Sequence, residues 1–496
     1  MAFVIGLDVG TTGTKAVLVD ERCQIIATAY KSYDFVVNNN GFVEQNPQDW
    51  WDAAIHTIRQ CVGKISVKNV KGLCLSTQGA TLVCADDKGE ALSSAIVWAD
   101  VRADKQGEYI NETYGKDFVY NKTGWRAQNC FNLLQMLWIR DNDPKLFDKT
   151  AKFLSTNEYM NFKLTGEYVG DPSNAAISEL YNIKQKKWDN ELLEILGISE
   201  TQLAQIIDSG EQIGYLSSSA SEYLGLPTGV PVFSGGHDQY MAAIGVGAVA
   251  SEDILLSCGT SWCIISITDK LVFDTVNYSS PGLHVLNNLY GTMAYTPAGG
   301  AALEWLRKKL FCADEPLPSY MSLNKMASQA PAGANGVMFM PHFSGTSYPT
   351  WSNLSRATLL GLNFLHGQPD VVRSVMEGVG FEINSMLETV KTKVGLGNNI
   401  HALGGATKSP IWMQIVSDIS GLNICKSTVS DAPPVGAAII AGVSSGIYED
   451  VDFATKKFNH NPKIVEPRAE ENRMYKELYA EYKRRFKLLR ECYELN

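Results

Sequence analysis

Short apolar runs separated by polar turns make up the first part of the chain. Residues 3–10 (FVIGLDVG) lead into a Gly-Thr-Thr-Gly turn, and residues 15–20 and 24–30 form two more apolar runs. Runs of this length, bounded by turn residues, predict β-strands, here an antiparallel meander. Residues 69–77 predict a further buried strand, and residues 80–92 predict a hairpin with a polar turn.

Helical spacing of apolar residues marks several other segments. Residues 47–62 carry a proline near their start and an acidic residue in their first turn, as helices do. Similar patterns predict helices at residues 131–142 and 370–394, a helix of small residues at 433–446, and a charged surface helix at 468–496.

The second half of the chain repeats the opening pattern. Residues 253–269 (DILLSCGTSWCIISITD) again predict a strand, a Gly-Thr turn and a strand. This similarity predicts duplicated halves that face one cleft, with a boundary near residues 245–251. We therefore expect an α/β protein with an N-terminal domain of residues 1–246 and a C-terminal domain of residues 247–496.

Composition narrows the class of protein. A chain of 496 residues is too long for one ordinary core, which also predicts at least two domains. The formal net charge of −10 argues against a general nucleic-acid binder. We see no run long enough to cross a membrane and no signal peptide. The ten cysteines include no Cys-x-x-Cys pair and lie mostly in apolar runs, which favours a reducing cytoplasm.

A Gly-Thr turn at residues 7–15 (LDVGTTGTK) is the first candidate site. Backbone N–H groups of such a turn can form a concavity that binds phosphate, and Thr11 and Thr12 add hydroxyl groups. Lys15 adds a charge for a terminal phosphate, and Asp8 is suited to Mg²⁺ held through water. The pattern is neither the Walker motif nor the dinucleotide fingerprint. A plain hairpin turn capped by Asp8 is the alternative.

Two further glycine-containing turns are candidates for holding a nucleotide. Gly259 and Thr260, in SCGTSW, would form a matching half of the phosphate site. Gly404 and Gly405, between a strand and a helix, permit the close approach of a purine or ribose, and Ser409 caps the helix that follows. Turn formation, capping and tight packing alone are the alternative for both segments.

The stretch SGGHDQY, residues 234–240, carries the one His-Asp pair of the chain. Asp238, at a strand end beside a Gly-Gly turn, is the candidate general base for a sugar hydroxyl. Gln239 offers a donor and an acceptor for a second hydroxyl. We assign His237 a structural role.

Polar residues near two other predicted strands complete the candidate sugar site. Gln78, expected to be exposed at a turn, suits a ligand with many hydroxyl groups, and Trp98 supplies an apolar floor for a sugar ring. Asp100 and Arg102 are candidates for holding hydroxyls, although a surface ion pair is our preferred interpretation of Arg102.

In this order, the segments resemble the FGGY family of carbohydrate kinases along essentially the whole chain. Besides the first turn, the similar segments are residues 41–51 (GFVEQNPQDWW), 95–103 (AIVWADVRA), 357–378 and 402–418. Residues 130–142 resemble the first family signature only loosely, because Gln135 stands where a Lys is usual.

The resemblance implies two actin-like (ribonuclease H-like) domains, with ATP and a sugar meeting in a central cleft. On this interpretation residues 1–246 bind the sugar and carry the first phosphate loop, and residues 247–496 bind the nucleotide. It implies Mg²⁺-dependent transfer of the γ-phosphate of ATP to a hydroxyl, with Asp238 as the catalytic base and Gln239 as a substrate contact. It also implies a homodimer. The matching nucleotide residues are Thr12 and Lys15 in the first loop, Thr260 in the second, Gly300 with Glu304 one turn later, and Gly405 and Ser409 in the adenosine loop.

Departures from the family pattern concern the substrate. D-Xylulose kinases carry Gln-Met-His-Gly where this chain has Gln78-Gly-Ala-Thr, and the Gln-Arg-Glu-Thr of glycerol kinases is absent too. The short form is more similar to the L-xylulose or L-fuculose branch. We therefore predict a kinase of a small ketose, a pentulose first, with a polyol kinase as the alternative.

A second alternative is a non-catalytic, actin-like nucleotide-binding module. Gln135 would agree with it, whereas Asp238 and Gln239 disfavour it. A dehydrogenase is disfavoured because no dinucleotide fingerprint follows the first strand.

Overall fold

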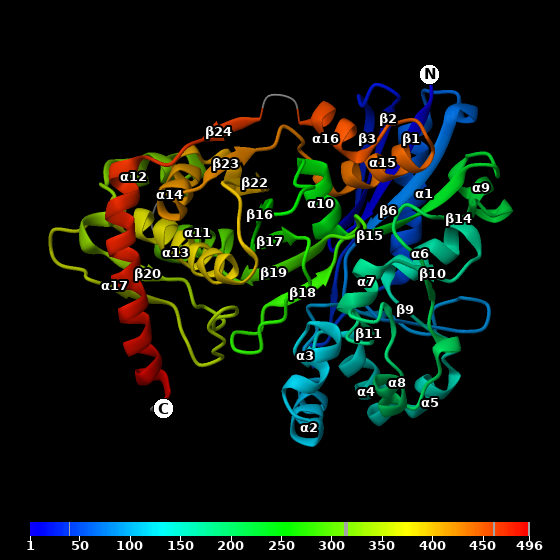
Figure 1. Cartoon of the computed structure of the whole chain (residues 1–496), viewed down its shortest axis with the longest axis horizontal. Helices are drawn as coiled ribbons and strands as arrows, with labels where there is room; N and C mark the ends of the chain where they lie inside the picture. Colours follow the sequence, from blue (N-terminus) through cyan, green and yellow to red (C-terminus); the bar gives the residue numbers. More distant parts are fainter. Residues whose placement is uncertain (39, 312–315, 460–461, 495–496) are drawn as a thin grey trace.

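The computed structural model describes residues 1–38, 40–311, 316–459 and 462–494. Two β-sheets organise it, one in each half of the chain. Figure 1 shows the first half on the right, in blue to green, and most of the second half on the left, in green to red. Cys312 of the sequence prediction lies outside the described residues.

The first sheet has the strand order β14-β15-β6-β1-β2-β3. β1, β2 and β3 are antiparallel neighbours, which confirms the predicted meander. β6 lies parallel to β1, and β15 lies parallel to β6. The strands are β1 (Phe3–Val9), β2 (Gly13–Asp20), β3 (Ile25–Ser32), β6 (Val70–Thr77), β14 (Gln212–Tyr215) and β15 (Pro231–His237).

The second sheet has the order β18-β19-β17-β16-β22-β23-β24. β16 and β17 form the predicted second hairpin, and β22 lies parallel to β16. The strands are β16 (Ile254–Cys258), β17 (Trp262–Thr268), β18 (Ser280–Leu283), β19 (Tyr290–Thr296), β22 (Asn399–Leu403), β23 (Asn423–Lys426) and β24 (Lys463–Val465).

The two sheets share one topology. The order β3-β2-β1-β6-β15 in the first corresponds to β19-β17-β16-β22-β23 in the second, with the same antiparallel and parallel pairings. The predicted repetition of the opening hairpin therefore extends over five strands in each half.

Helices cover both sheets and confirm the predicted long segments. In the first half they are α1 (Pro47–Val62), α2 (Asp104–Tyr114), α3 (Asp117–Thr123), α4 (Asn132–Asn142), α5 (Pro144–Lys149), α6 (Thr156–Thr165), α7 (Pro172–Ile177), α8 (Asn190–Leu196), α9 (Ser218–Leu224) and α10 (Asp238–Val246). In the second half they are α11 (Gly300–Trp305), α12 (Tyr320–Gln329), α13 (Gln368–Val394), α14 (Pro410–Ser420), α15 (Ala432–Ser444), α16 (Val451–Phe458) and α17 (Ala469–Glu494). No described helix is long and apolar enough to span a membrane.

Small strands complete the fold. They are β4 (Val36–Val37), β5 (Val43–Gln45), β8 (Ala95–Ile96), β10 (Val169–Gly170), β11 (Tyr181–Asn182), β12 (Lys187–Trp188), β13 (Gln205–Ile206), β20 (Met338–Met340) and β21 (Thr358–Leu360), together with β7 (Val83–Ala85) and β9 (Lys152–Leu154). The predicted hairpin at residues 80–92 forms its polar turn, but β7 pairs along its length with β9, a partner from a distant segment.

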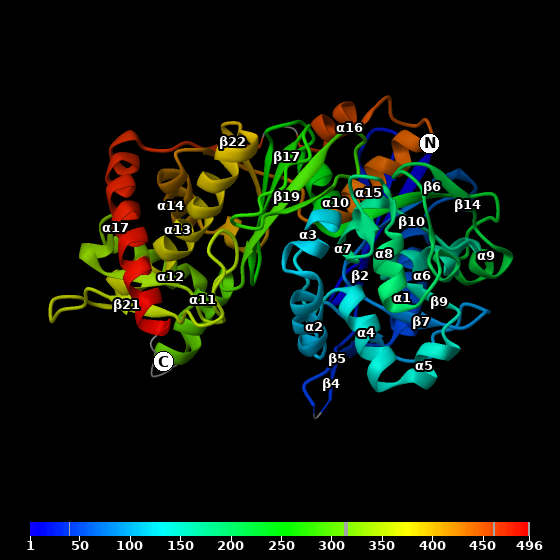
Figure 2. The ribbon, with the colours of Figure 1, turned by 60° about the horizontal axis from the view of Figure 1, so that its bottom comes forward.

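The C-terminal part of the chain returns to the first sheet. α15 contacts β1, β2, β6 and β15, and the hydroxyl of Tyr448 donates to the carbonyl oxygen of Asp20 at 2.8 Å. Figure 2 shows α15 and α16 beside the first-half strands. The division into residues 1–246 and 247–496 stays a prediction, and α15 is the segment that crosses it.

The predicted small-residue helix α15 packs closely against α10, which itself contacts strands of both sheets. A Cβ built on Gly436 of α15 would lie 2.0 Å from the carbonyl oxygen of Met241 in α10. Only a glycine leaves room for this backbone approach.

The Gly436→Ala substitution is expected to destabilise the protein by about 1–3 kcal/mol, because an added methyl group must push two helix backbones apart. Urea unfolding measures the change. The control is Gly229→Ala, where nothing lies within 4 Å of the new Cβ. Equal stability of the two variants would contradict the packing argument.

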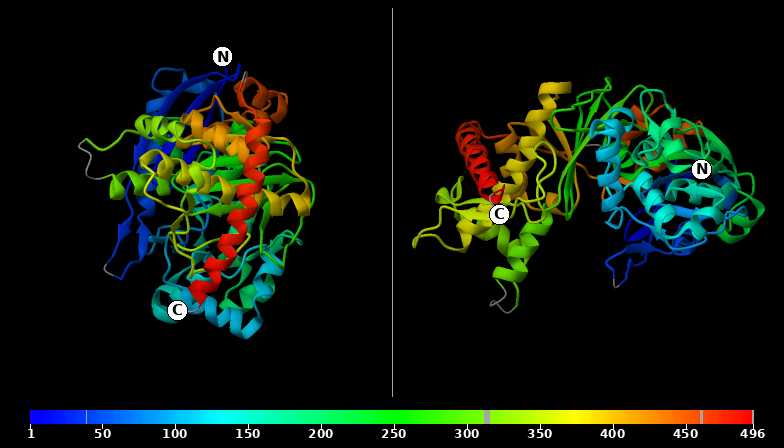
Figure 3. Two further views of the ribbon diagram at one scale, coloured as in Figure 1. Left: turned by 90° about the vertical axis from the view of Figure 1, so that its left-hand side faces the viewer. Right: turned by 90° about the horizontal axis from the view of Figure 1, so that it is seen from below.

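The C-terminal helix α17 lies at the outer end of the second half (Figure 3). Its predicted surface position is confirmed, but one side buries Tyr475, Tyr479 and Tyr482. The Tyr475 hydroxyl donates to Glu377 at 2.6 Å, and Arg373 donates to the same carboxylate at 2.8 Å. This buried network ties α17 to α13.

Candidate active site

Three parallel strands bring their carboxyl ends together at the candidate site. In the register of the first sheet, Asp8 of β1 lies beside Ser76 of β6, and Ser76 lies beside Gly236 of β15. Because parallel neighbours end at the same edge, residues that follow these strands gather there. The edge therefore collects Asp8, Gln78 and Asp238 from segments far apart in the sequence.

Asp238 begins α10 directly after β15, and its side chain is 24% exposed. The preceding glycines do not form the predicted Gly-Gly turn. Gly235 and Gly236 lie inside β15, and a Cβ on Gly235 would fall 1.8 Å from the carbonyl oxygen of Leu75. The sequence interpretation was wrong here, because these glycines allow close approach of two strands.

The Asp8 carboxyl is the most strongly perturbed acid on this edge of the sheet. Burial, and then the negative charge of Asp238, raise its pKa to about 7. A hydrogen bond of 2.6 Å from the Ser76 hydroxyl and the charge of Lys15 oppose this rise. Two carboxylates thus lie close enough to interact, which is a setting that favours a bound cation.

Lys15 does not stand free in the first turn. Its ammonium group forms an ion pair with Asp431, the residue that precedes α15. Asp431 was missed by the sequence analysis, because about 400 residues separate the partners and no local pattern connects them. Two negative charges, Asp238 and Asp431, act on Asp8, whereas Lys15 is the one positive charge that does so. The carboxylates therefore leave an excess of negative charge, which fits a phosphate that binds together with Mg²⁺.

Tyr33 holds the first turn in place and was also missed. Its hydroxyl donates to the Gly10 carbonyl oxygen at 2.6 Å, and Thr14 donates to the Tyr33 hydroxyl at 3.4 Å. Thr12 is exposed at the turn, and Thr11 is half-buried. No sequence signal pointed to Tyr33, because this residue lies far from the turn in the chain and belongs to no motif.

A chain of amide and indole groups links the first turn to the candidate sugar residues. Gln78 donates to the Gln45 side chain at 2.9 Å, and Gln45 donates to the Thr11 carbonyl oxygen at 2.6 Å. The Trp98 indole, 47% exposed, donates to the Thr11 hydroxyl at 3.1 Å. Gln78 and Trp98 thus adjoin the first turn. The prediction that Gln78 is exposed is wrong, because Gln45 and the first turn cover this side chain and leave it only 1% exposed. The side-chain oxygens of Gln78 and Gln239 are buried without a hydrogen-bond partner.

Arg102 and Asp100 form a buried ion pair, and the preferred interpretation as a surface pair was wrong. The Arg102 guanidinium donates to both oxygens of Asp100 at 2.8 Å, and the two side chains are 4% and 0% exposed. The guanidinium also contacts Glu44 and lies over the Phe42 and Trp138 rings. This network anchors the segment that carries Trp98.

The predicted nucleotide residues of the second half meet around the β16–β17 turn. The backbone N–H groups of Gly300 and Ala301 donate to the carbonyl oxygens of Gly259 and Thr260 at 3.1 and 3.0 Å. A Cβ on Gly404, which has φ of +100°, would lie 2.7 Å from the Cys258 carbonyl oxygen. Two other segments, one at Gly300 and one at Gly404, therefore meet at this turn.

Two other predicted nucleotide residues already use their polar groups within the protein. The Ser409 hydroxyl accepts from the Trp412 N–H and donates to Asn324 at 2.7 Å. Glu304 binds Arg307, Lys308 and Tyr320, and these contacts, Arg307 first, hold the pKa of its carboxyl well below the usual range. Nothing lies within 4 Å of a Cβ on Gly405, so this glycine borders open space.

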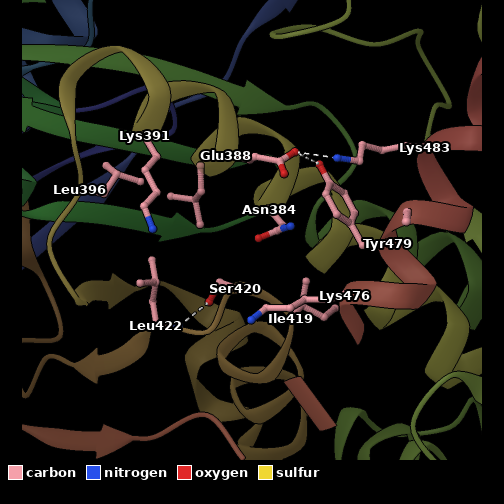
Figure 4. A pocket seen from close by; sticks show the side chains of 12 residues that line it. Asn384, Glu388, Lys391, Leu396, Ile419, Ser420, Leu422, Lys476, Tyr479 and Lys483 are labelled. Atoms are coloured by element: carbon pink, nitrogen blue, oxygen red, sulfur yellow. Dashed lines mark hydrogen bonds and ion pairs between the residues drawn. The ribbon is translucent and has the colours of Figure 1, made fainter. Parts of the chain in front are cut away.

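A surface cavity of about 400 Å³ lies elsewhere, between α13, α14 and α17 (Figure 4). Lys391, Lys476 and Lys483 stand at it, and Lys483 pairs with Glu388 at 2.8 Å. None of the predicted site residues lines it. The candidate site rests on the strand-end geometry and not on this cavity.

Two sheets of the same topology, covered by helices, define a two-domain protein of the α/β class. The model of the N-terminal domain of the FGGY family of carbohydrate kinases matches residues 3–245, and that of the C-terminal domain matches residues 254–445. The chain therefore belongs to the FGGY family of carbohydrate kinases.

Curated relatives and solved structures agree with this assignment. The chain is 30% identical to a xylulose kinase of Bacillus subtilis (strain 168), covering 97% of this chain and 96% of that protein. It is also 30% identical to a glycerol kinase of Thermococcus gammatolerans, over 91% and 90% of the two chains. A ligand-bound xylulose kinase of Lactobacillus acidophilus superposes with a TM-score of 0.94 at 27% identity, covering 100% and 99%.

Proposed function

We propose that the protein transfers the γ-phosphate of ATP to a hydroxyl group of a ketose, a pentulose first. The observation that carries this proposal is the pair of carboxylates, Asp8 and Asp238, at the carboxyl ends of neighbouring strands. Similarity to xylulose kinases over nearly the whole chain supports the ketose.

In the proposed reaction Asp238 accepts the proton of the sugar hydroxyl. The hydroxyl oxygen can then attack the γ-phosphorus as the bond to the leaving ADP oxygen breaks. Phosphoryl transfer needs positioning and charge stabilisation more than covalent chemistry, so one base near the hydroxyl is sufficient. Gln78, Gln239 and Trp98 would position the sugar, and their placement at one sheet edge supports that role.

The remaining predicted residues would hold Mg²⁺-ATP. Asp8 would bind Mg²⁺, which neutralises phosphate charge when present. Thr11, Thr12 and Lys15 would contact the transferred phosphate, and Lys15 would exchange its partner Asp431 for it. In the second half Gly259, Thr260, Gly300, Gly404 and Gly405 would contact the nucleotide, with Glu304 and Ser409 supporting the loops that their present contacts hold.

The polyol alternative stays open, because the chain is also 30% identical to a glycerol kinase, over 91% of its length. Homodimer formation and a location in a reducing cytoplasm also stay predictions. Among the described residues the cysteines are unpaired, which is compatible with that location.

A substrate panel tests the proposed function. The protein is incubated with Mg²⁺-ATP and single ketoses, polyols or aldonates, and ADP release is coupled to NADH oxidation. We expect at least one pentulose to give the highest kcat/KM. If a polyol gives the highest value, the alternative is correct. If no compound raises ADP release above the sugar-free rate, the proposed kinase function is wrong.

A further inference from the structure

A buried acid outside the predicted site, Glu179, has an unsatisfied side chain. It follows α7 and is 0% exposed, and its Oε2 has no hydrogen-bond partner. Its Oε1 accepts one hydrogen bond, from the Gln128 N–H at 3.2 Å. Burial raises the pKa of this carboxyl well above its usual range, and the Gln128 N–H is the opposing contact among the described residues.

The backbone of Glu179 is also unfavourable. Its φ of +60° lies in the left-handed region, which non-glycine residues other than Asn and Asp rarely adopt. Burial of the acid, its unpartnered oxygen and its left-handed backbone each cost free energy of folding. Residues with such costs are concentrated at functional sites.

Packing connects Glu179 to the strand edge that carries Asp238. α7 contacts β15 and β18, and Figure 1 shows it next to both. A Cβ on Gly79, directly after Gln78, would lie 2.6 Å from the His237 ring and 3.3 Å from the side chain of Ile177. Ile177 ends α7, two residues before Glu179, so the end of this helix adjoins the predicted sugar residues.

Electrostatic neighbours give a second connection, through the second sheet. Burial and then the charge of Glu179 raise the pKa of Cys130 to about 12, and burial and then Asp238 raise the pKa of Cys263 to about 12. Both thiols also act on Tyr295. Burial, and then the charges of Cys130 and Cys263, raise the pKa of the Tyr295 hydroxyl to about 12. The charges of Glu179 and Asp238 therefore each act on one of two thiols that both act on Tyr295.

One more unpartnered group belongs to the segment that contacts Glu179. The indole N–H of Trp125 is buried without a partner, three residues before Gln128. Trp125 shares a hydrophobic cluster with Ile177 and Tyr240. The unpartnered carboxyl oxygen of Glu179 and the indole N–H of Trp125 are both suited to hydroxyl groups, which can donate and accept.

We propose that Glu179 is a specificity-determining residue whose free carboxyl oxygen forms a hydrogen bond with a hydroxyl group of the sugar, so that the enzyme takes neutral sugars and rejects sugar acids. This inference rests on the proposed function and names the class of substrate more narrowly. A carboxylate of an aldonate would meet the buried carboxyl of Glu179, and such an encounter leaves a buried charge unpaired.

The test compares Glu179→Gln with the wild type on the best neutral sugar of the panel and on gluconate. Glutamine keeps the acceptor for the Gln128 N–H and removes the acid. We expect KM for the neutral sugar to rise about 10- to 100-fold with a small change in kcat, and KM for ATP to stay unchanged. The ratio of kcat/KM for gluconate to that for the neutral sugar should increase.

Glu158→Gln is the matched control. Glu158 is another buried acid, 4% exposed, whose pKa burial raises to about 7, but it is satisfied in the capping box of α6. It should leave both KM values unchanged. Glu179→Asn, which tolerates the left-handed backbone, is the second variant, and melting temperatures establish that each protein is folded.

The outcomes separate the two proposals. An active wild type with an unchanged sugar KM in both folded Glu179 variants overturns the role of Glu179 and leaves the kinase function standing. A gluconate preference in the wild type also overturns it. A wild type that no sugar stimulates overturns both.

Discussion

Replacement of Asp238 by asparagine is expected to lower kcat for sugar phosphorylation by about 10²- to 10⁴-fold, the usual contribution of a general base. Asparagine has nearly the shape of the aspartate, so α10 should still begin at this residue. It cannot accept the proton of the hydroxyl. Coupled ADP release measures kcat, and titration with a fluorescent ATP analogue measures nucleotide affinity.

A matched variant separates the loss of the base from the loss of a charge. Asp452→Asn removes an exposed acid of α16, 61% exposed and paired with Lys456, and should leave kcat unchanged. Nucleotide affinity should be retained in both proteins. Substantial residual turnover in Asp238→Asn would remove Asp238 from the role of catalytic base.

Replacement of Asp8 by asparagine is expected to abolish turnover and, in the absence of ligand, to stabilise the fold. In the folded protein, burial and Asp238 raise the pKa of Asp8 to about 7 from an ordinary value of 3.8. The folded state therefore binds this proton more tightly than the unfolded state, and the stability it contributes is lost as the pH rises through 7. Asparagine does not ionise and avoids the loss.

The stabilisation by Asp8→Asn should depend on pH in one direction. Near pH 4 the carboxyl is protonated in the folded state and about half ionised in the unfolded state, so the two proteins should differ by less than about 1 kcal/mol. The difference should grow up to about pH 7 and reach about 2–4 kcal/mol at pH 8. Urea unfolding at pH 4 and pH 8, without Mg²⁺ or ATP, measures it. A wild type more stable than the variant at pH 8 would contradict the assignment.

Local sequence patterns predicted the secondary structure around the site well. Proline and acidic residues mark the start of α1, and the observed helix, Pro47–Val62, has the predicted bounds. The hairpins at residues 3–20 and 253–269 form as predicted, because apolar runs around a Gly-Thr turn leave few other ways to pair. The family resemblance added the ordering of these parts.

Local patterns failed where a residue's role depends on a distant neighbour. Two consecutive glycines, Gly235 and Gly236, are typical of a turn, yet both lie inside a strand and the backbone of Leu75 lies against Gly235. Arginine usually lies at the protein surface, yet Phe42, Glu44 and Trp138 surround the side chain of Arg102. Glycine and arginine each suit two environments, and only the packed neighbours select one.

The residues of the candidate site show the same difference between local patterns and distant contacts. Asp8, Gln78 and Asp238 were found from the sequence, because each follows or ends a recognisable strand. Asp431, Tyr33 and Ser76 were not, because they act as partners of those residues and carry no motif of their own. A partner is defined by the contact, and a contact between distant segments leaves no local signal.

The sequence by itself determined the strands, the main helices, the repeated hairpins and the family, since these depend on periodicity, turn residues and ordered motifs. Only the tertiary structure decided which charges meet. It placed Asp8 near Asp238, paired Lys15 with Asp431, and buried Glu179 with an unsatisfied oxygen. The physical reason is that periodicity is a property of neighbours in the chain, whereas burial and charge interaction depend on neighbours in space.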